Sequence, residues 1–181
     1  VNYAMHTMAA RGYSPVLTPD LVKQSVVSAC GFAPRGPHTQ IYTIEGSDLA
    51  LAATAEAPLA GMFAGKRIAA ESLPIKKVGF SHCFRTEVGA RGADVRGLYR
   101  LHQFSKVELF AVTSPAQSEA VLEELLGASE GLLQELGLAY RVLEMASEEL
   151  GSPAYRKYDI EAWMPGRTAG EGEGDGEGQG G

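Results

Sequence analysis

The sequence has few cysteines and no long apolar segment. Its 181 residues include only Cys30 and Cys83, and neither cysteine belongs to a CxxC pair. Two reduced thiols in an intracellular protein are therefore favoured over a disulfide, and the absence of any Cys/His cluster argues against a zinc site. No apolar run approaches the length needed to cross a bilayer, so we expect no membrane association.

Several patterns that mark well-known sites are also missing. There is no GxxxxGK[ST] motif and no GxGxxG following a strand, which excludes a P-loop or Rossmann site. No Ser/His/Asp or Cys/His arrangement indicates covalent catalysis. The start, VNYAMHTMAARGY, has no Met and no features of a targeting segment; it has the pattern of a helix interior. We therefore expect upstream sequence to be missing, and any targeting segment would lie in that missing part.

Acidic residues are concentrated at the C-terminal end. Residues 168–181 contain four acids, no basic residue and the stretch GEGEGDGEGQGG. Such a composition cannot bury apolar surface, so we expect this tail to be disordered, either as an interaction tail or as a result of truncation. Without those four acids the formal net charge of −6 would be −2. The body therefore lacks the basic surface of a dedicated nucleic-acid-binding module.

Residues 1–167 have the pattern of one α+β domain. The segments with helical patterns are 1–11, 20–29, 55–64 and 114–137, the last opening with a Ser-Pro-Ala-Gln capping box and ending at a glycine. The segments with extended patterns are 13–18, 40–44, 48–52, 77–87, 98–112, 140–146 and 155–164. Strands outnumber helices and do not alternate strictly with them, which favours a mainly antiparallel sheet flanked by helices.

Two strands predict a shared polar face. Strand alternation places Arg85 and Glu87 on one face of segment 77–87, and Phe104, Lys106 and Glu108 on one face of segment 98–112. The opposite faces are apolar and predict the core side. A solvated, salt-bridged surface and a binding face explain this pattern equally well.

The kinds of residue on that face favour a nucleotide site. A nucleotide is bound by an arginine fork on phosphate, an aromatic plane on the base and carboxylates on amino groups. Arg85, Phe104, Glu87 and Glu108 supply that set, and an arginine- and glycine-rich loop over residues 88–97 could cover a polyphosphate.

The stretch FRTEVGARGADVRGLYRLHQFSKVELF resembles motif 2 of the class II aminoacyl-tRNA synthetases, and Thr54-Ala55-Glu56 resembles their TxE element. GYSPVLTPDLV resembles the end of motif 1, with Pro19 as its proline. RGLYRLHQFSKVE and ELGSPAYRKYDIEAWMPGR resemble seryl-tRNA synthetases, particularly the organellar branch. The resemblance extends over residues 1–167 and implies a partial class II catalytic domain.

The resemblance also implies roles in binding ATP. Arg85 would bind the α-phosphate, Glu87 would accept a hydrogen bond from the adenine amino group, and Phe104 would stack on adenine. Arg85 and Glu87 would thereby act in catalysis. Mg²⁺ would accompany ATP in the complete enzyme.

The remaining implied roles concern serine. Thr54 and Glu56 would help to hold serine and its ammonium group, and Glu108 would accept a hydrogen bond from the serine hydroxyl. The implied activity is a serine–tRNA ligase: serine is activated to seryl-adenylate and passed to tRNA(Ser). Neither step requires a protein nucleophile, because alignment and charge neutralisation dominate such transfers.

The sequence departs from the family pattern after the MPGR stretch. The motif 3 arginine, the acids that would hold Mg²⁺ and the N-terminal tRNA-binding arm do not occur in it, so we expect this chain alone to be inactive. The parent protein is expected to be a homodimer in a mitochondrion or plastid, with the cytoplasm as an alternative. Two other functions stay open: a non-catalytic, synthetase-like protein with an interaction or tRNA-associated role, and a related ligase for threonine or proline.

Overall fold

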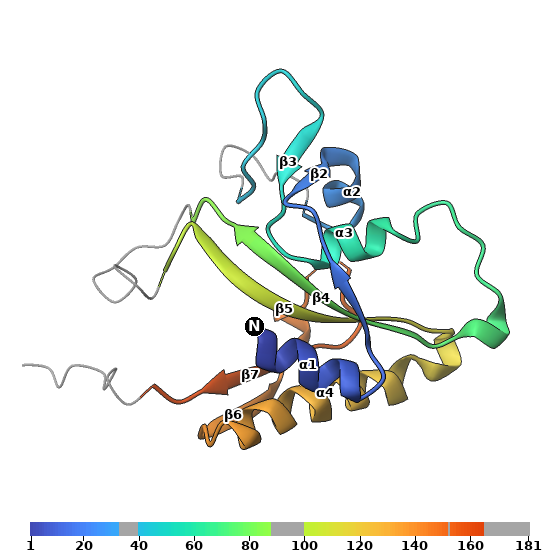
Figure 1. The fold of residues 1–181 in the computed structure, drawn as a ribbon, viewed down its shortest axis with the longest axis vertical. Helices are drawn as coiled ribbons and strands as arrows, with labels where there is room; N and C mark the ends of the chain where they lie inside the picture. The colour runs from blue at the N-terminus through green and yellow to red at the C-terminus, as the bar shows by residue number, and fades with distance from the viewer. Residues whose placement is uncertain (33–39, 88–99, 152, 165–181) are drawn as a thin grey trace, which may run out of the picture.

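A three-stranded sheet forms the centre of the protein (Figure 1). The computed structural model describes residues 1–32, 40–87, 100–151 and 153–164. The sheet order is β1 (Ser14–Leu17), β4 (Ile75–Phe84), β5 (Gln103–Val112). The α+β expectation is confirmed, and β4 and β5 pair antiparallel along their whole length. β1 departs from the antiparallel pattern, because it lies parallel to β4.

Two helices cover one face of this sheet. They are α1 (Asn2–Ala10) and α4 (Ser118–Glu135), which lie together below the sheet in Figure 1. Met8 of α1, Ala128 of α4 and Val78 of β4 are buried in a common core. The apolar face predicted from strand alternation is therefore the core side of the β4–β5 pair.

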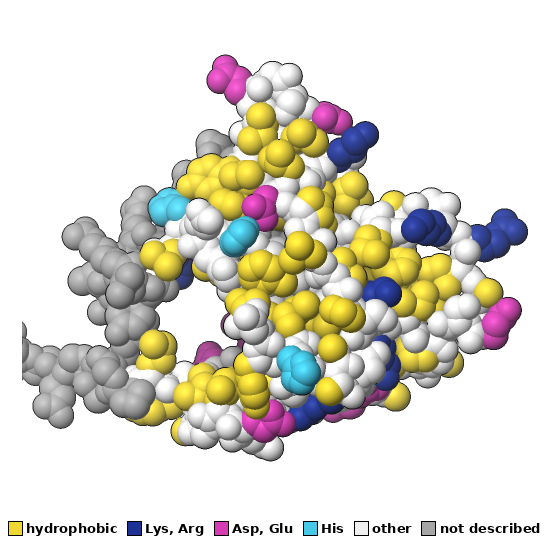
Figure 2. Space-filling view, viewed as in Figure 1, with side chains coloured by type: hydrophobic (Ala, Val, Ile, Leu, Met, Phe, Trp, Pro, Cys, Tyr) yellow, Lys and Arg dark blue, Asp and Glu magenta, His cyan; other side chains and the backbone are white. Residues whose placement is uncertain are grey.

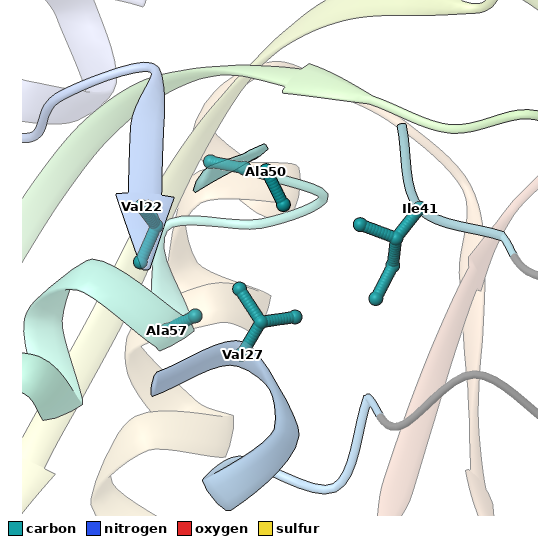
Figure 3. Packing of buried hydrophobic residues seen from close by; sticks show 6 residues of the cluster. Val22, Val27, Ile41, Ala50 and Ala57 are labelled. Carbon is teal, nitrogen blue, oxygen red and sulfur yellow. The ribbon is translucent and has the colours of Figure 1, made fainter. Parts of the chain in front are cut away.

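The other face carries a smaller layer made from the first third of the chain. Its elements are β2 (Leu21–Lys23), α2 (Gln24–Ala29), β3 (Leu49–Leu51) and α3 (Glu56–Gly61). The strands β2 and β3 pair antiparallel. Figure 3 shows the small apolar side chains that fill this layer, and the labelled ones are Val22, Val27, Ile41, Ala50 and Ala57. This layer carries the TxE segment to the sheet.

The last strands form a separate antiparallel pair, β6 (Tyr140–Glu144) with β7 (Tyr158–Ala162). Ion pairs from Arg156 to Glu119 and Glu123 connect this pair to α4. Three short 3-10 helices complete the described elements: η1 (Ala70–Ser72), η4 (Pro115–Gln117) and η5 (Ser147–Glu149).

The capping prediction for the long helix is confirmed. The Gln117 side chain accepts a hydrogen bond from the Ser114 backbone N–H, and Ser114 and Gln117 form a capping box around η4, which leads into α4. Gly137 follows the helix with a φ of 68°, a backbone conformation that glycine adopts without a steric penalty.

Some predicted boundaries are wrong. Segment 20–29 is not one helix, because its first residues pair with β3 as β2. Segment 40–44 forms no strand, only a single bridge from Thr43 to Ala50. The strand predicted at 77–87 spans Ile75–Phe84 instead, and the strand predicted at 98–112 begins only at Gln103.

Two predictions fall on residues that the structure does not describe. The predicted loop 88–97 and the tail 168–181 lie outside the described residues. Among the helices of the described ranges, none has the length and apolar character of a membrane-spanning segment.

Candidate functional site

Small residues of β4 make room for large side chains of β5. The antiparallel register sets three pairs side by side on the predicted polar face: Gly79 with Glu108, Ser81 with Lys106, and Cys83 with Phe104. Ser81 is 1% exposed and Cys83 is fully buried, so the β4 side of this face is closed to solvent. The face predicted from alternation in β5 is confirmed, because Phe104, Lys106 and Glu108 all lie on this side of the sheet.

Gly79 also lets α3 approach the sheet. A Cβ atom at this position would lie 2.9 Å from Cδ1 of Leu59, a side chain of α3 that is fully buried. Real Cβ atoms do not make contacts this short. The close approach of α3 brings the preceding segment, residues 53–56, onto the β5 side chains.

Thr54, Lys106 and Glu108 form one hydrogen-bonded cluster. The Thr54 hydroxyl donates to Oε2 of Glu108 at 2.7 Å and accepts from Nζ of Lys106 at 2.6 Å. Lys106 Nζ also lies 2.6 Å from Oε2 of Glu108. Thr54 is buried, whereas the side chains of Lys106 and Glu108 keep 32% and 24% of their surface exposed. The two predicted serine-binding residues, Thr54 and Glu108, are therefore in direct contact.

Glu56 is the third predicted serine-binding residue, and it opens α3 two positions after Thr54. Its backbone N–H donates to the Thr54 hydroxyl at 3.4 Å. Although the residue as a whole is exposed, desolvation of its carboxyl raises its pKa above the ordinary value. The nearby Glu108 carboxylate raises this pKa further, while Lys106 lowers it. Glu56 therefore belongs to the same electrostatic cluster as Lys106 and Glu108.

Arg85, the predicted phosphate ligand, lies beside the predicted adenine platform. Its Nε donates to the carbonyl oxygen of Ala53 at 3.3 Å, and its guanidinium lies 5.2 Å from the ring centre of Phe104. The backbone bond and the cation–π contact together orient a planar group whose geometry matches a phosphate. Because Ala53 directly precedes Thr54, one short segment contacts both the Arg85–Phe104 pair and the Glu108 cluster.

Glu87 has a different setting from the one that alternation predicts. It follows the end of β4 and has a φ of 52°, so the alternation of β4 does not extend to its side chain. Its carboxylate accepts a hydrogen bond from Nε of Arg100 at 2.6 Å. The structure therefore gives no support to a common strand face for Arg85 and Glu87, and the predicted role of Glu87 at adenine stays a prediction.

Sequence reasoning placed Lys106 on the right face but gave it no function. Alternation alone could not show that its ammonium contacts both Thr54 and Glu108, because Thr54 comes from a distant segment. Ala53 was also missed, because it contributes only its backbone carbonyl. Nothing in a side-chain pattern signals such a contact.

No described residues are arranged to bind a metal ion. Across the part of the chain that the structure describes, no three His, Cys, Asp or Glu side chains lie close enough together to form such a site. The described residues therefore do not by themselves form a protein-held Mg²⁺ site.

The fold and this site define a class of protein. The chain belongs to the tRNA synthetase class II core domain family (G, H, P, S and T), whose family model matches residues 41–173. Within that class, the curated relatives and solved structures that the chain matches are serine–tRNA ligases.

The curated relatives share about half of their aligned residues with this chain. The chain is 54% identical over 166 residues to the serine–tRNA ligase of Rhodopirellula baltica, a match that covers 92% of this chain and 39% of the relative. It is 52% identical over 167 residues to the serine–tRNA ligase of Rubrobacter xylanophilus, again covering 92% and 39%. The chain thus spans about two fifths of the length of these relatives.

Solved structures agree with the sequence comparison. A crystal structure of seryl-tRNA synthetase from Pyrococcus horikoshii complexed with ATP matches with a TM-score of 0.85 and 41% identity, covering 92% of this chain and 37% of that one. The cytoplasmic serine–tRNA ligase of Naegleria fowleri in complex with AMP matches with the same TM-score and identity, covering 94% and 40%. The expected class II fold is confirmed.

Proposed function

We propose that this chain supplies part of the catalytic core of a serine–tRNA ligase, which activates serine with ATP and transfers it to tRNA(Ser). One observation carries the proposal. Residues 53–56 contact an arginine–aromatic pair through Ala53 and a carboxylate–hydroxyl cluster through Thr54. The first suits a nucleotide and the second suits a small polar amino acid, so two substrates can meet on one sheet face.

The nucleotide half consists of Arg85 and Phe104. Arg85 offers a fixed guanidinium to the α-phosphate, and Phe104 offers an apolar ring to adenine. The structures that resemble this chain were solved with ATP and AMP, which supports ATP as the nucleotide. Glu87, held by Arg100, is the remaining candidate for contact with the adenine amino group.

The amino-acid half consists of Thr54, Glu56 and Glu108. Glu56 offers a carboxylate to the substrate ammonium, and Glu108 offers an acceptor to the serine hydroxyl. A substrate without the hydroxyl would leave this acceptor unpaired, which is the basis for rejecting alanine.

The reaction follows from this arrangement. The serine carboxylate attacks the α-phosphorus of ATP, which forms seryl-adenylate and releases pyrophosphate. The ribose hydroxyl at the tRNA end then attacks the serine carbonyl and releases AMP. Arg85 stabilises the charge that develops at the α-phosphate, and the substrate-binding residues align the reacting groups.

The activity belongs to a longer polypeptide in this proposal, because the chain spans about two fifths of its relatives. The parts beyond that overlap would supply further contacts to ATP, Mg²⁺ and tRNA(Ser). A non-catalytic, synthetase-like protein is the competing function. It would have no need for Arg85 and Glu108 to contact residues 53–56 through Ala53 and Thr54.

We also propose a homodimer. Apolar side chains are exposed at the start of the chain, with Leu17 of β1 81% exposed and Tyr3 of α1 49% exposed. Figure 2 shows apolar side chains on the face where α1 and β1 lie in Figure 1. Light scattering at increasing concentration should give the mass of a dimer, and Leu17→Ser should shift the chain toward monomer. A monomer at all concentrations would contradict this.

A mitochondrion or plastid is the proposed location, with the cytoplasm as the alternative. The support is the similarity of RGLYRLHQFSKVE and ELGSPAYRKYDIEAWMPGR to the organellar branch of seryl-tRNA synthetases. Microscopy of the tagged parent protein in its own cells, with organelle markers, is the test.

Aminoacylation is the test of the proposed function. In a polypeptide that we call the completed enzyme, residues 1–167 replace the matching segment of the Rhodopirellula baltica serine–tRNA ligase. It should attach serine to tRNA(Ser) and attach neither threonine nor proline to their tRNAs. A folded completed enzyme that binds tRNA(Ser) without charging it would favour the non-catalytic function.

A further inference from the structure

The ammonium group of Lys106 contacts both Thr54 and Glu108 in the amino-acid half of the site. It donates to the Thr54 hydroxyl and pairs with Glu108, both at 2.6 Å. Lys106 and Glu108 stand two positions apart on one face of β5, and Ser81 beneath them is almost fully buried. Such a short, partly buried pair fixes both side chains more firmly than a surface ion pair does.

This arrangement uses only one oxygen of the Glu108 carboxylate. Oε2 accepts from both Thr54 and Lys106. Among the described residues, no donor bonds to Oε1, and no buried side-chain oxygen lacks a partner. Oε1 is therefore open to the site, where it can accept one further hydrogen bond.

Glu56 differs from Glu108 in its partners. Within the described ranges, the Glu56 carboxylate forms no ion pair, while Glu108 has the Lys106 ammonium. Desolvation and the charge of Glu108 raise the pKa of Glu56, and the charge of Lys106 offsets this rise only in part. A bound ammonium would supply a cation for an ion pair with Glu56.

The charges of the cluster balance with one substrate ammonium. Glu56 and Glu108 carry two negative charges, and Lys106 carries one positive charge. The excess of one negative charge equals the charge of a single ammonium group. A neutral hydroxyl, and not a second cation, then fits at the open oxygen of Glu108.

We propose that Lys106 is a positioning residue that commits Glu108 to recognising the substrate hydroxyl and leaves Glu56 to bind the substrate ammonium. This inference rests on the proposed serine site. Lys106 contacts no substrate; it acts by neutralising and orienting Glu108, so that two nearby carboxylates take different parts. Its effect is on the choice between a hydroxyl and a second amine in the substrate.

L-2,3-diaminopropionate tests this choice because it carries an amine where serine carries its hydroxyl. With Lys106 in place, its second ammonium meets a carboxylate that already has a cation. Replacement of Lys106 by methionine removes that cation while keeping a side chain of similar length. The site then carries two uncompensated negative charges, which suit a diamine better than serine.

The experiment uses the full 181-residue chain with ¹³C-labelled glutamate side chains. Serine and L-2,3-diaminopropionate are titrated separately at mildly acidic pH, where both amines of the latter are protonated, and the carboxyl signals of Glu56 and Glu108 report binding. Lys106→Met should shift the ratio of the two affinities by about tenfold or more toward the diamine. Lys106→Arg keeps the charge and should keep the preference for serine. Lys66→Met, at an exposed lysine after α3, should change neither affinity.

A second readout requires no ligand. Because Lys106 lowers the pKa of Glu56 in the wild-type chain, Lys106→Met should raise that pKa further, while Lys106→Arg and Lys66→Met should leave it near the wild-type value. An unchanged Glu56 pKa in Lys106→Met would overturn the inference. So would an equal loss of affinity for both ligands.

The two readouts separate this inference from the proposed function. If the wild-type chain binds no serine but the Glu56 pKa rises in Lys106→Met, the coupling of Lys106 to the carboxylates stands and the serine site is contradicted. If serine binds and its selectivity against the diamine does not depend on Lys106, the serine site stands and the role of Lys106 is overturned.

Discussion

The hydroxyl of Thr54 donates a 2.7 Å hydrogen bond to the carboxylate of Glu108. The two residues are distant in sequence, one just before α3 and the other in the middle of β5. Their contact depends on Gly79, which lets Leu59 and α3 approach the sheet. The predicted serine site is therefore assembled by packing between layers, and changes to that packing should affect it.

Glu108→Gln should reduce serine activation by the completed enzyme while ATP binding stays near wild type. The amide oxygen is a weaker acceptor, and the amide group cannot pair with Lys106 as the carboxylate does. Loss of a charge-assisted hydrogen bond costs about 1.5–3 kcal/mol, or roughly ten- to a hundredfold in kcat/KM for serine. Exchange kinetics at varied serine and ATP measure both effects. Lost ATP binding with unchanged serine dependence would show that the two halves of the site are assigned wrongly.

Arg85→Lys should weaken ATP binding by the completed enzyme nearly as much as Arg85→Ala does. Lysine keeps the charge but loses both the fork geometry and the stacking on Phe104. We expect a loss of roughly tenfold or more in ATP affinity, measured by calorimetry. Arg67→Ala, at an exposed arginine beyond α3, is the matched control and should bind ATP as the wild type does. Full ATP affinity in Arg85→Lys would mean that only the charge at this position matters.

Much of the α+β fold and one face of the candidate site could be predicted from the sequence. The alternation in β5 correctly placed Phe104, Lys106 and Glu108 together, since a strand's period of two is fixed by its geometry. Alternation failed at Glu87, because β4 ends at Phe84 and the backbone turns to a positive φ. Strand length depends on pairing with distant residues, which a local pattern does not contain.

The same limit explains the wrong boundaries near the start of the chain. Residues 21–23 have a pattern compatible with a helix, yet they pair with β3, whose residues lie much further along. The contact of Lys106 with Thr54 is of the same kind. Both depend on tertiary packing that only the folded chain reveals.

Glu56 should affect stability and substrate binding in opposite directions. Its pKa is raised in the folded chain, so the folded state favours the protonated form. The stability this provides is fully present below the unfolded pKa and is lost as the pH rises through the folded pKa. At neutral pH the ionised Glu56 therefore destabilises the fold, and Glu56→Gln should raise the urea midpoint there.

The same substitution should reduce serine affinity at neutral pH, because the amide cannot neutralise the substrate ammonium. In the wild type, serine affinity should fall on acidification through the raised pKa of Glu56. Urea titrations and serine titrations of both proteins across this pH range are the measurements. A lower urea midpoint for Glu56→Gln at neutral pH would contradict the direction of the pKa shift.

Gly79→Ala should destabilise the chain. The added methyl group would lie 2.9 Å from Cδ1 of Leu59, whose side chain is fully buried. Such overpacking costs about 1–3 kcal/mol in the free energy of unfolding, measured by urea denaturation. Gly127→Ala is the matched control, because this helical glycine in α4 has no atom within 4 Å of an added Cβ. It should stabilise the chain by about 0.5–1 kcal/mol. Equal effects at both positions would contradict the packing of α3 against β4.

Serine-dependent ATP–pyrophosphate exchange tests the central claim most directly, because it measures adenylate formation alone, without tRNA. The completed enzyme should exchange pyrophosphate with serine and remain at background with alanine, threonine and proline, while the 181-residue chain alone should show no exchange. The unmodified Rhodopirellula baltica ligase, assayed in parallel, controls for the conditions. A folded completed enzyme that exchanges with none of the four amino acids, or prefers threonine or proline to serine, would contradict the account.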